Sequence, residues 1–207
     1  MKKLMFVIDI IFILLVAYGV SKILGTVKLK PGIKVPNTPY QTNIVNPEKI
    51  IIKDITITPL AYFSMNGKIL SKKRYWFGRE TQLSKYDFAM GWKMMSDESF
   101  LENIRISQSN RWYFWKTKNM NINFDDVIFN SANMHLIPAN KEIARKLQKA
   151  KIGQIIHMEG YLIKAEHASG WRWVSSLSRK DSGAHACEVV FVKEFEILIS
   201  NKKDDYL

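Results

Sequence analysis

The chain has 207 residues, with 31 Lys and Arg against 19 Asp and Glu, a formal net charge of +12 and one cysteine. This length fits one domain with an appendage or two small domains, and a lone cysteine excludes an intrachain disulfide and a cysteine-rich metal site. The sequence contains no Walker A, GxGxxG, HExxH or GxSxG motif. It therefore lacks the signatures of the commonest nucleotide-binding proteins, zinc proteases and α/β-hydrolases.

The N-terminus predicts a membrane anchor over residues 1–24. Residues 4–21 are apolar apart from Asp9, and as a helix they are long enough to cross the ~30 Å hydrocarbon core of a bilayer. Lys2 and Lys3 favour an N-terminus in the cytoplasm. We therefore expect a bacterial inner-membrane protein whose soluble domain faces the periplasm. A cleaved signal peptide is the alternative, because residues 17–19 (Ala-Tyr-Gly) resemble a signal-peptidase site.

Residues 25–48 are predicted to be a stiff linker, because they contain four of the six prolines of the chain. A globular domain is expected over residues 49–207. With Lys2, Lys3, Lys22 and Asp9 set aside, the rest of the chain has a net charge of +10. This charge suits an acidic protein partner, an anionic envelope polymer or lipid headgroups, whereas export makes nucleic acid a poor expectation.

The first half of the domain is predicted to be mainly strand. A β-branched strand is expected over residues 49–57, and Asn66-Gly67 is expected to form a hairpin turn between two further strands. Ser96 is expected to cap a short helix over residues 97–103. Strands are predicted over residues 111–115 and 126–130.

The second half contains the clearest helix, residues 141–150, with Asn140 as its N-cap. Strands are predicted to follow over residues 154–165, 170–176 and 187–199, with Gly160 marking a bulge or a barrel corner. Long curved strands with one or two helices indicate a strand-rich α+β domain built around a small barrel of the OB or SH3 type.

Four groups of residues in this chain are distinctive as sequence motifs. They are Asp87–Trp92 with Met95–Asp97, Ile106–Gln108 with Arg111–Trp115, Ser131–Ala139, and Trp171–Ser176 with Arg179, Asp181, Gly183, Cys187 and Glu188. Over about residues 85–195, these groups resemble a family of uncharacterised, mostly proteobacterial, membrane-anchored or exported proteins. The resemblance implies the layout of an anchor plus a domain, and it implies no activity, cofactor or catalytic residue.

The densest group of polar residues lies between residues 175 and 188. In a nucleophilic interpretation, Cys187 is the thiolate, His185 or His135 is its base, and Asp181 or Asn133 orients that base. The opposing interpretation makes Cys187 a small buried hydrophobic residue at the start of a strand.

The same loop permits an anion site, in which Arg179 acts with Ser175, Ser176 and backbone N–H groups at Gly183. Alternatively, Arg179 and Asp181 pair with each other and fix the shape of the loop. No metal site is expected, because the four histidines lack ligand spacing, and no cofactor is expected.

Aromatic residues form the other candidate surface. Strand alternation places Trp112 and Phe114 on one face, and Arg111 on the opposite face, while Trp171 and Trp173 share a face. An open aromatic face would stack against sugars or bases with help from arginine, whereas a closed one is barrel core.

These features favour a non-catalytic envelope module that contacts a membrane-complex subunit or an anionic envelope polymer. The alternatives are a hydrolase or transferase that uses Cys187 with a histidine, and an exported nucleic-acid-binding domain. The site is expected around the 175–188 loop, with His135, Trp171 and Trp173 beside it.

Overall fold

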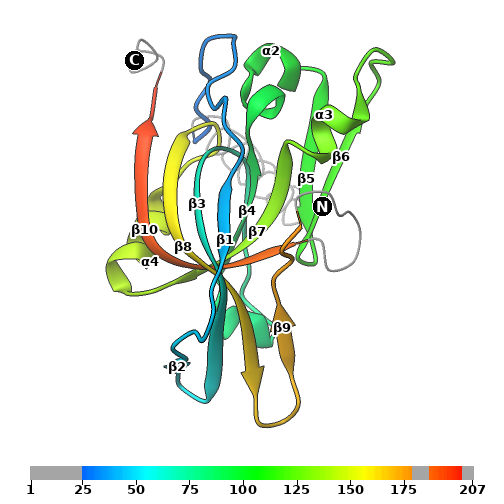
Figure 1. Ribbon diagram of the computed structural model, residues 1–207. Helices are drawn as coiled ribbons and strands as arrows, with labels where there is room; N and C mark the ends of the chain where they lie inside the picture. The colour runs from blue at the N-terminus through cyan, green and yellow to red at the C-terminus, as the bar shows by residue number, and fades with distance from the viewer. Residues whose placement is uncertain (1–24, 179–186, 202–207) are drawn as a thin grey trace, which may run out of the picture.

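The centre of the molecule is a ring of strands (Figure 1). The computed structural model describes residues 25–178 and 187–201. Within them, β3 (Ile55–Arg74) pairs with β4 (Tyr86–Gly91), β4 with β7 (Ser131–Pro138), β7 with β10 (Glu188–Ile199), β10 with β8 (Ile155–His167), and β8 returns to β3. All of these pairings are antiparallel except that of β7 with β10. The predicted strand-rich α+β class is confirmed.

The remaining elements extend or cover this ring. The added strands are β1 (Tyr40–Asn43) and β2 (Ile50–Ile52) on β3, β9 (Arg172–Val174) on β8, and the separate hairpin of β5 (Ile104–Ser109) and β6 (Trp112–Thr117). The helical elements are η1 (Arg79–Gln82), η2 (Lys93–Ser96), α2 (Glu98–Leu101), α3 (Phe124–Ile128) and α4 (Lys141–Lys149).

The main core fills the inside of the ring. Alternate residues along the strands, such as Phe63, Met134 and Val190, belong to one buried cluster. Helix α4 adds Ile143 and Leu147 to the same cluster. Its predicted position is confirmed: the side chain of Asn140 accepts the Ile143 N–H at 2.9 Å, which caps the first turn.

The predicted turn at Asn66-Gly67 is wrong. Both residues lie inside the 20-residue strand β3, where Asn66 pairs with His157 and Gly67 with Ile156. Continuous pairing with β8 outweighs the local preference for a turn. The glycine has a different role here, because a Cβ at position 67 would press into the methyl ends of Met65 and Met90 in the core.

Several local boundaries also differ from the sequence predictions. The strand expected over 49–57 is a β2–β3 hairpin that turns at Lys53, which has a φ of 55°. The strand expected over 126–130 is instead mostly helix α3, capped by Asn123. Asp97, rather than Ser96, caps the short helix α2. Asp97 and Asn123 are both residues whose side chains readily accept a hydrogen bond from a helix N-terminus.

Gly160 allows two strands to approach closely. A Cβ at this position would overlap the backbone carbonyl of Phe191 on β10. The pairing of β8 with β10 shifts register between Val192 and Glu194, directly beside the glycine. The irregularity expected at Gly160 is therefore found as a bulge in the facing strand.

Residues 25–48, expected to be a spacer, are part of the folded domain. Leu29 and Val35 are buried in the main core cluster. The backbone N–H of Gly32 donates to Asp97 at 2.8 Å, and that of Val35 donates to Ser96 at 3.0 Å. Strand β1 then pairs with β3. The proline-containing segment therefore packs on the barrel and is not a free spacer.

The predicted anchor, residues 4–21, lies outside the described residues. Among the helices of the part that is described, none is long and apolar enough to span a bilayer.

The packing of residues 25–48 can be tested at two apolar positions of one segment. Leu29→Ala should lower the free energy of unfolding by about 3 kcal/mol, because a core side chain is removed and leaves a cavity. Ile33→Ala is the matched control: Ile33 is 48% exposed, so we expect a loss below about 1 kcal/mol. Urea unfolding measures both changes. Equal effects in the two variants would mean that the segment does not pack on the core.

Candidate functional site

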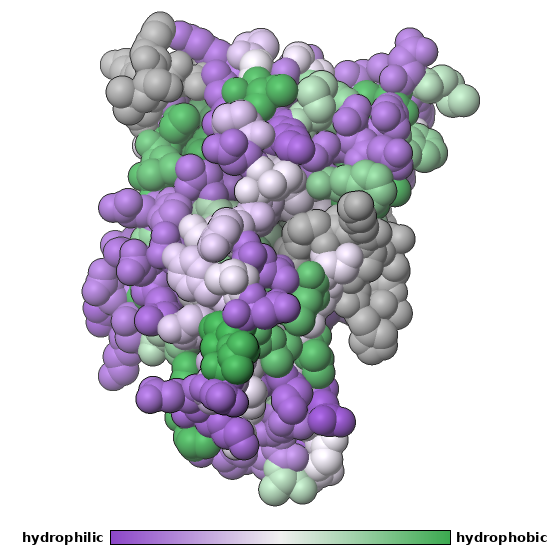
Figure 2. All heavy atoms as spheres, viewed as in Figure 1, coloured by the Kyte–Doolittle hydropathy of each residue, from purple (hydrophilic) through white to green (hydrophobic). Residues whose placement is uncertain are grey.

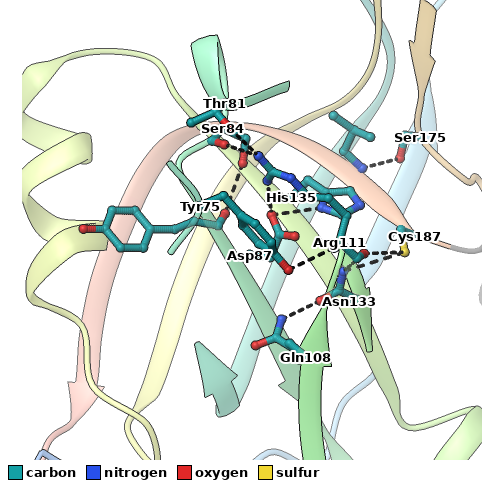
Figure 3. Close-up of polar contacts among 12 residues, drawn as sticks. Tyr75, Thr81, Ser84, Asp87, Gln108, Arg111, Asn133, His135, Ser175 and Cys187 are labelled. Carbon is teal, nitrogen blue, oxygen red and sulfur yellow. Dashed lines mark hydrogen bonds and ion pairs between the residues drawn. The ribbon is translucent and has the colours of Figure 1, made fainter. Parts of the chain in front are cut away.

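A buried polar cluster lies on the outer face of β4 and β7 (Figure 3). Asp87 on β4 pairs in register with His135 on β7, and both side chains point away from the core because Phe88, Met134 and Leu136 occupy the inside. Asp87 is 0% exposed and His135 is 3% exposed. Buried polar side chains on the outside of a barrel require a covering element.

The β5–β6 hairpin covers this face, and Arg111 at its turn binds the cluster. Arg111 Nη1 donates to Asp87 Oδ1 at 2.6 Å, and Nη2 donates to the Ser84 carbonyl at 2.8 Å and to Thr81 Oγ1 at 3.2 Å. The guanidinium group also stacks on Tyr75, 4.1 Å from the ring centroid. Arg111 therefore ties the hairpin to the loop between β3 and β4 as well as to the barrel.

A strained turn holds Arg111 in this position. Asn110 and Arg111 form the two-residue connection between Ser109 and Trp112, with φ values of 50° and 67°. Left-handed backbone at a residue other than glycine costs about 1 kcal/mol. The contacts of the arginine side chain offset this cost.

His135 completes the environment of Asp87. Its Nδ1 lies 3.0 Å from Asp87 Oδ1, within ion-pair distance, but the two atoms are not aligned as a hydrogen bond. The imidazole ring packs on Trp173, with 4.9 Å between centroids. Among the described residues, Asp87 Oδ2 has no hydrogen-bond partner. One carboxylate oxygen thus faces both the Arg111 guanidinium and the His135 ring, and breaking the buried pair of Asp87 and Arg111 is costly.

A second chain of contacts joins the hairpin to β7 and β10. Gln108 Nε2 donates to Asn133 Oδ1 at 2.7 Å, and Asn133 Nδ2 donates to the Arg111 carbonyl at 2.9 Å. Cys187 Sγ lies 3.7 Å from Asn133 Nδ2 and 3.9 Å from the Arg111 carbonyl. Further along the hairpin, Tyr113 contacts Ser131, and burial raises the pKa of Tyr113 to about 12.

The structure places the predicted catalytic residues as follows. Cys187 is half-buried and contacts the turn of the hairpin. His135 lies within strand β7, and it faces Asp87 and Trp173. His185, Asp181 and the predicted anion-binding residue Arg179 lie outside the described residues. The described contacts of His135 therefore do not pair it with Cys187.

The other predicted binding residues have structural contacts. Ser175 Oγ donates to the Ser176 carbonyl at 2.8 Å and accepts the Val189 N–H at 3.0 Å, so it braces the start of β10. Ser176 is buried. Trp171 and Trp173 pack against a second apolar cluster outside the ring, with their centroids 6.3 Å apart. The Arg111 guanidinium contacts the Trp173 ring, and the same ring packs on His135. These two predicted residues therefore do share one site.

Sequence reasoning missed Asp87, Gln108 and Tyr75 as members of this site. A signal for Asp87 was present: it is the only charge in the otherwise apolar run of residues 86–92. Gln108 and Tyr75 reach the site only through the folding of the hairpin and of the β3–β4 loop, so local spacing gives no indication of them.

Comparisons with known proteins assign no relationship. No family model, curated protein or solved structure matches this chain. Within residues 25–178 and 187–201, no three His, Cys, Asp or Glu side chains are grouped so that they could hold a metal ion. Inferences about function therefore rest on the geometry of the site and its surface.

The contribution of Arg111 to the free energy of unfolding can be compared with that of another arginine in the same hairpin. Arg111→Met should lower the free energy of unfolding by about 3 kcal/mol, because Asp87 is left buried without its main partner. Arg105→Met should cost less than about 0.5 kcal/mol, since Arg105 is exposed. The double variant Arg111→Met with Asp87→Asn should regain part of the loss. Urea unfolding that gives equal values for Arg111→Met and Arg105→Met would contradict the buried ion pair.

Proposed function

We propose that this protein is a membrane-anchored, non-catalytic binding module of the bacterial envelope. In this proposal residues 4–21 anchor it in the inner membrane, and the domain lies in the periplasm. Its partner is a protein subunit of an envelope complex, which it contacts through the outer face of the β5–β6 hairpin. The observation that carries the proposal is a pair of exposed aromatic side chains, Trp112 and Phe114, on a hairpin fixed to the barrel by a buried ion pair.

The order of strands supports an OB-type barrel. Around the ring the order is β3-β4-β7-β10-β8, with α4 in the connection between β7 and β8. OB barrels use the face of their second and third strands, together with the loops beside it, to bind oligonucleotides and oligosaccharides. The corresponding strands here are β4 and β7, and the chain's own hairpin covers them. This covering disfavours nucleic acid or a polymer on that face.

The outer face of the hairpin has the composition of a protein-binding surface. Trp112 is 43% exposed and Phe114 is 49% exposed, and their cross-strand partners are the small residues Ser109 and Ser107. Arg105 and Lys116 pair at the next position on the same face. Aromatic anchors surrounded by polar and basic residues are typical of the residues that contribute most to protein–protein binding.

The rigidity of the hairpin also makes its outer face suitable for binding a protein. The contacts of Arg111, Gln108 and Tyr113 hold the hairpin from below. A surface that is already ordered loses less conformational entropy on binding, so more of the contact energy contributes to affinity.

Photocrosslinking in cells tests this proposal. A benzoylphenylalanine at position 114 of the full chain should give one discrete protein adduct, and the adduct should be lost when Trp112→Ala is added. The same probe at position 77 is the matched control: Phe77 is 91% exposed but lies in the β3–β4 loop, so no such adduct is expected.

The captured protein, identified by mass spectrometry, should bind the purified wild-type chain and fail to bind Trp112→Ala. Absence of an adduct at position 114 would contradict the proposal. Salt-sensitive retention on single-stranded DNA, heparin or cell-wall polymer that Trp112→Ala abolishes would replace the protein partner by a polymer.

A further inference from the structure

We infer that the exposed basic face of helix α4 lies against anionic phospholipid headgroups of the membrane in which the chain is anchored. This inference rests on the anchor of the proposed function and adds a second contact between the domain and the bilayer.

The outward face of α4 carries a stripe of three basic residues beside the neutral Gln148. Lys141, Arg145 and Lys149 are exposed and recur every four residues, which places them on one face of the helix. Exposed Lys151 follows directly after the helix. The opposite face, with Ile143 and Leu147, is buried in the core. The basic side chains therefore point away from the barrel.

Acidic groups near α4 lie on its flank. Glu142 is the acidic residue of the helix, and it pairs with Lys146 at 3.0 Å. Glu194 and Glu196 of β10 line a cleft together with Glu142 and Lys146. These carboxylates lie beside Lys146. The positive charge of Lys141, Arg145 and Lys149 therefore remains on the outward face. In Figure 2, hydrophilic side chains cover the left edge of the molecule, where Figure 1 places α4.

The chain enters the domain beside the end of α4. The Val27 N–H donates to the Ile152 carbonyl at 2.8 Å, one residue beyond Lys151. Gly153 packs so closely on Val27 that a Cβ there would overlap the Val27 carbonyl. Lys72 holds the helix end in place by donating to the carbonyls of Leu147, Gln148 and Ala150 at 2.7–2.8 Å. The entry point and the basic stripe are thus parts of one rigid region.

The distance to the predicted anchor is short. Only residues 22–26 separate the span 4–21 from Val27, and the six steps from residue 21 to residue 27 reach at most about 21 Å when extended. Lys22 and exposed Lys28 add positive charge to the same stretch. A basic surface held this close to a bilayer is attracted to anionic lipids, and the attraction decays within a Debye length of about 8 Å. The tether makes the membrane, rather than a soluble polyanion, the anion that α4 meets most often.

This orientation of the domain on the bilayer agrees with a protein partner that binds on the side away from the membrane. Figure 1 shows α4 and the β5–β6 hairpin on opposite sides of the barrel. With α4 against the bilayer, Trp112 and Phe114 face away from it.

A fluorescent probe in the full-length chain tests the inference. Dansylalanine replaces Gln148, an exposed residue of α4, and in a second protein it replaces Ser107 on the outer face of the hairpin. Each protein is reconstituted into vesicles of phosphatidylcholine alone or with phosphatidylglycerol. The probe at position 148 should shift to the blue when phosphatidylglycerol is present and return toward its original emission in high salt. The probe at position 107 should not respond.

Two pairs of substitutions that change the net charge equally, one on α4 and one on the hairpin, supply the control. Arg145→Gln should lower the ratio of docked to undocked domain roughly fivefold, and Arg145→Glu with Lys149→Glu should abolish the shift. Arg105→Glu with Lys116→Glu makes the same change in charge on the hairpin and should leave the shift intact. A shift that persists in the first pair, or that both pairs abolish equally, would overturn the inference.

Flotation of the vesicles in high salt separates this inference from the proposed function. A chain that floats but shows no lipid-dependent shift at position 148 retains its anchor and overturns only the docking of α4. A chain that fails to float in high salt has no anchor, which overturns the membrane part of the proposed function together with this inference.

Discussion

The ion pair between Arg111 and Asp87 holds a separate hairpin over the outer face of the barrel. Asp87 is fully buried on β4, and Arg111 reaches it from the turn of a hairpin that shares no strand pairing with the barrel. An isolated two-stranded hairpin is at best marginally stable in water, so β5–β6 depends on its contacts with the barrel, which include the apolar packing of Ile104 with Leu70 and Ala89 as well as the ion pair. The pair therefore both covers a polar region and fixes the position of the aromatic surface above it.

This arrangement of the described residues is the basis on which we propose binding and not catalysis. Among the described residues, His135 faces Asp87 and packs on Trp173, and Asn133 bonds Gln108 and the main chain of Arg111. Cys187 lies against the same turn. What the hairpin leaves accessible is Trp112 and Phe114, together with the basic stripe of α4 on the other side of the barrel. We propose that these are two binding surfaces of different chemistry, one aromatic and one cationic.

Much of the fold could be predicted where local signals and burial agree. Helix α4 has a cap and an apolar face, and β8 and β10 are long runs rich in apolar residues, so all three were predicted close to their observed bounds. The errors occur where tertiary pairing overrides local preference. Asn66-Gly67 is a strong turn signal, but strands pair along β3 through that point, and the prolines of residues 31–47 were interpreted as a spacer although Leu29 and Val35 enter the core. In the site, Arg111 and Trp173 were predicted from their residue types, whereas the partner Asp87 depends on a strand register that the sequence alone does not reveal.

Amide hydrogen exchange of Arg111→Met, compared with the wild-type chain, tests the central claim most directly. If the ion pair fixes the hairpin on the barrel, backbone amides of residues 104–117 should lose more protection in the variant than those of β3, β8 and β10, which should lose only as much as global stability falls, about 3 kcal/mol. Unchanged protection across residues 104–117 would contradict the account, because the hairpin would then be held without Arg111. A loss of protection in residues 104–117 that only equals the loss in the barrel strands would contradict it as well, because the ion pair would then support the whole fold and not the placement of one hairpin.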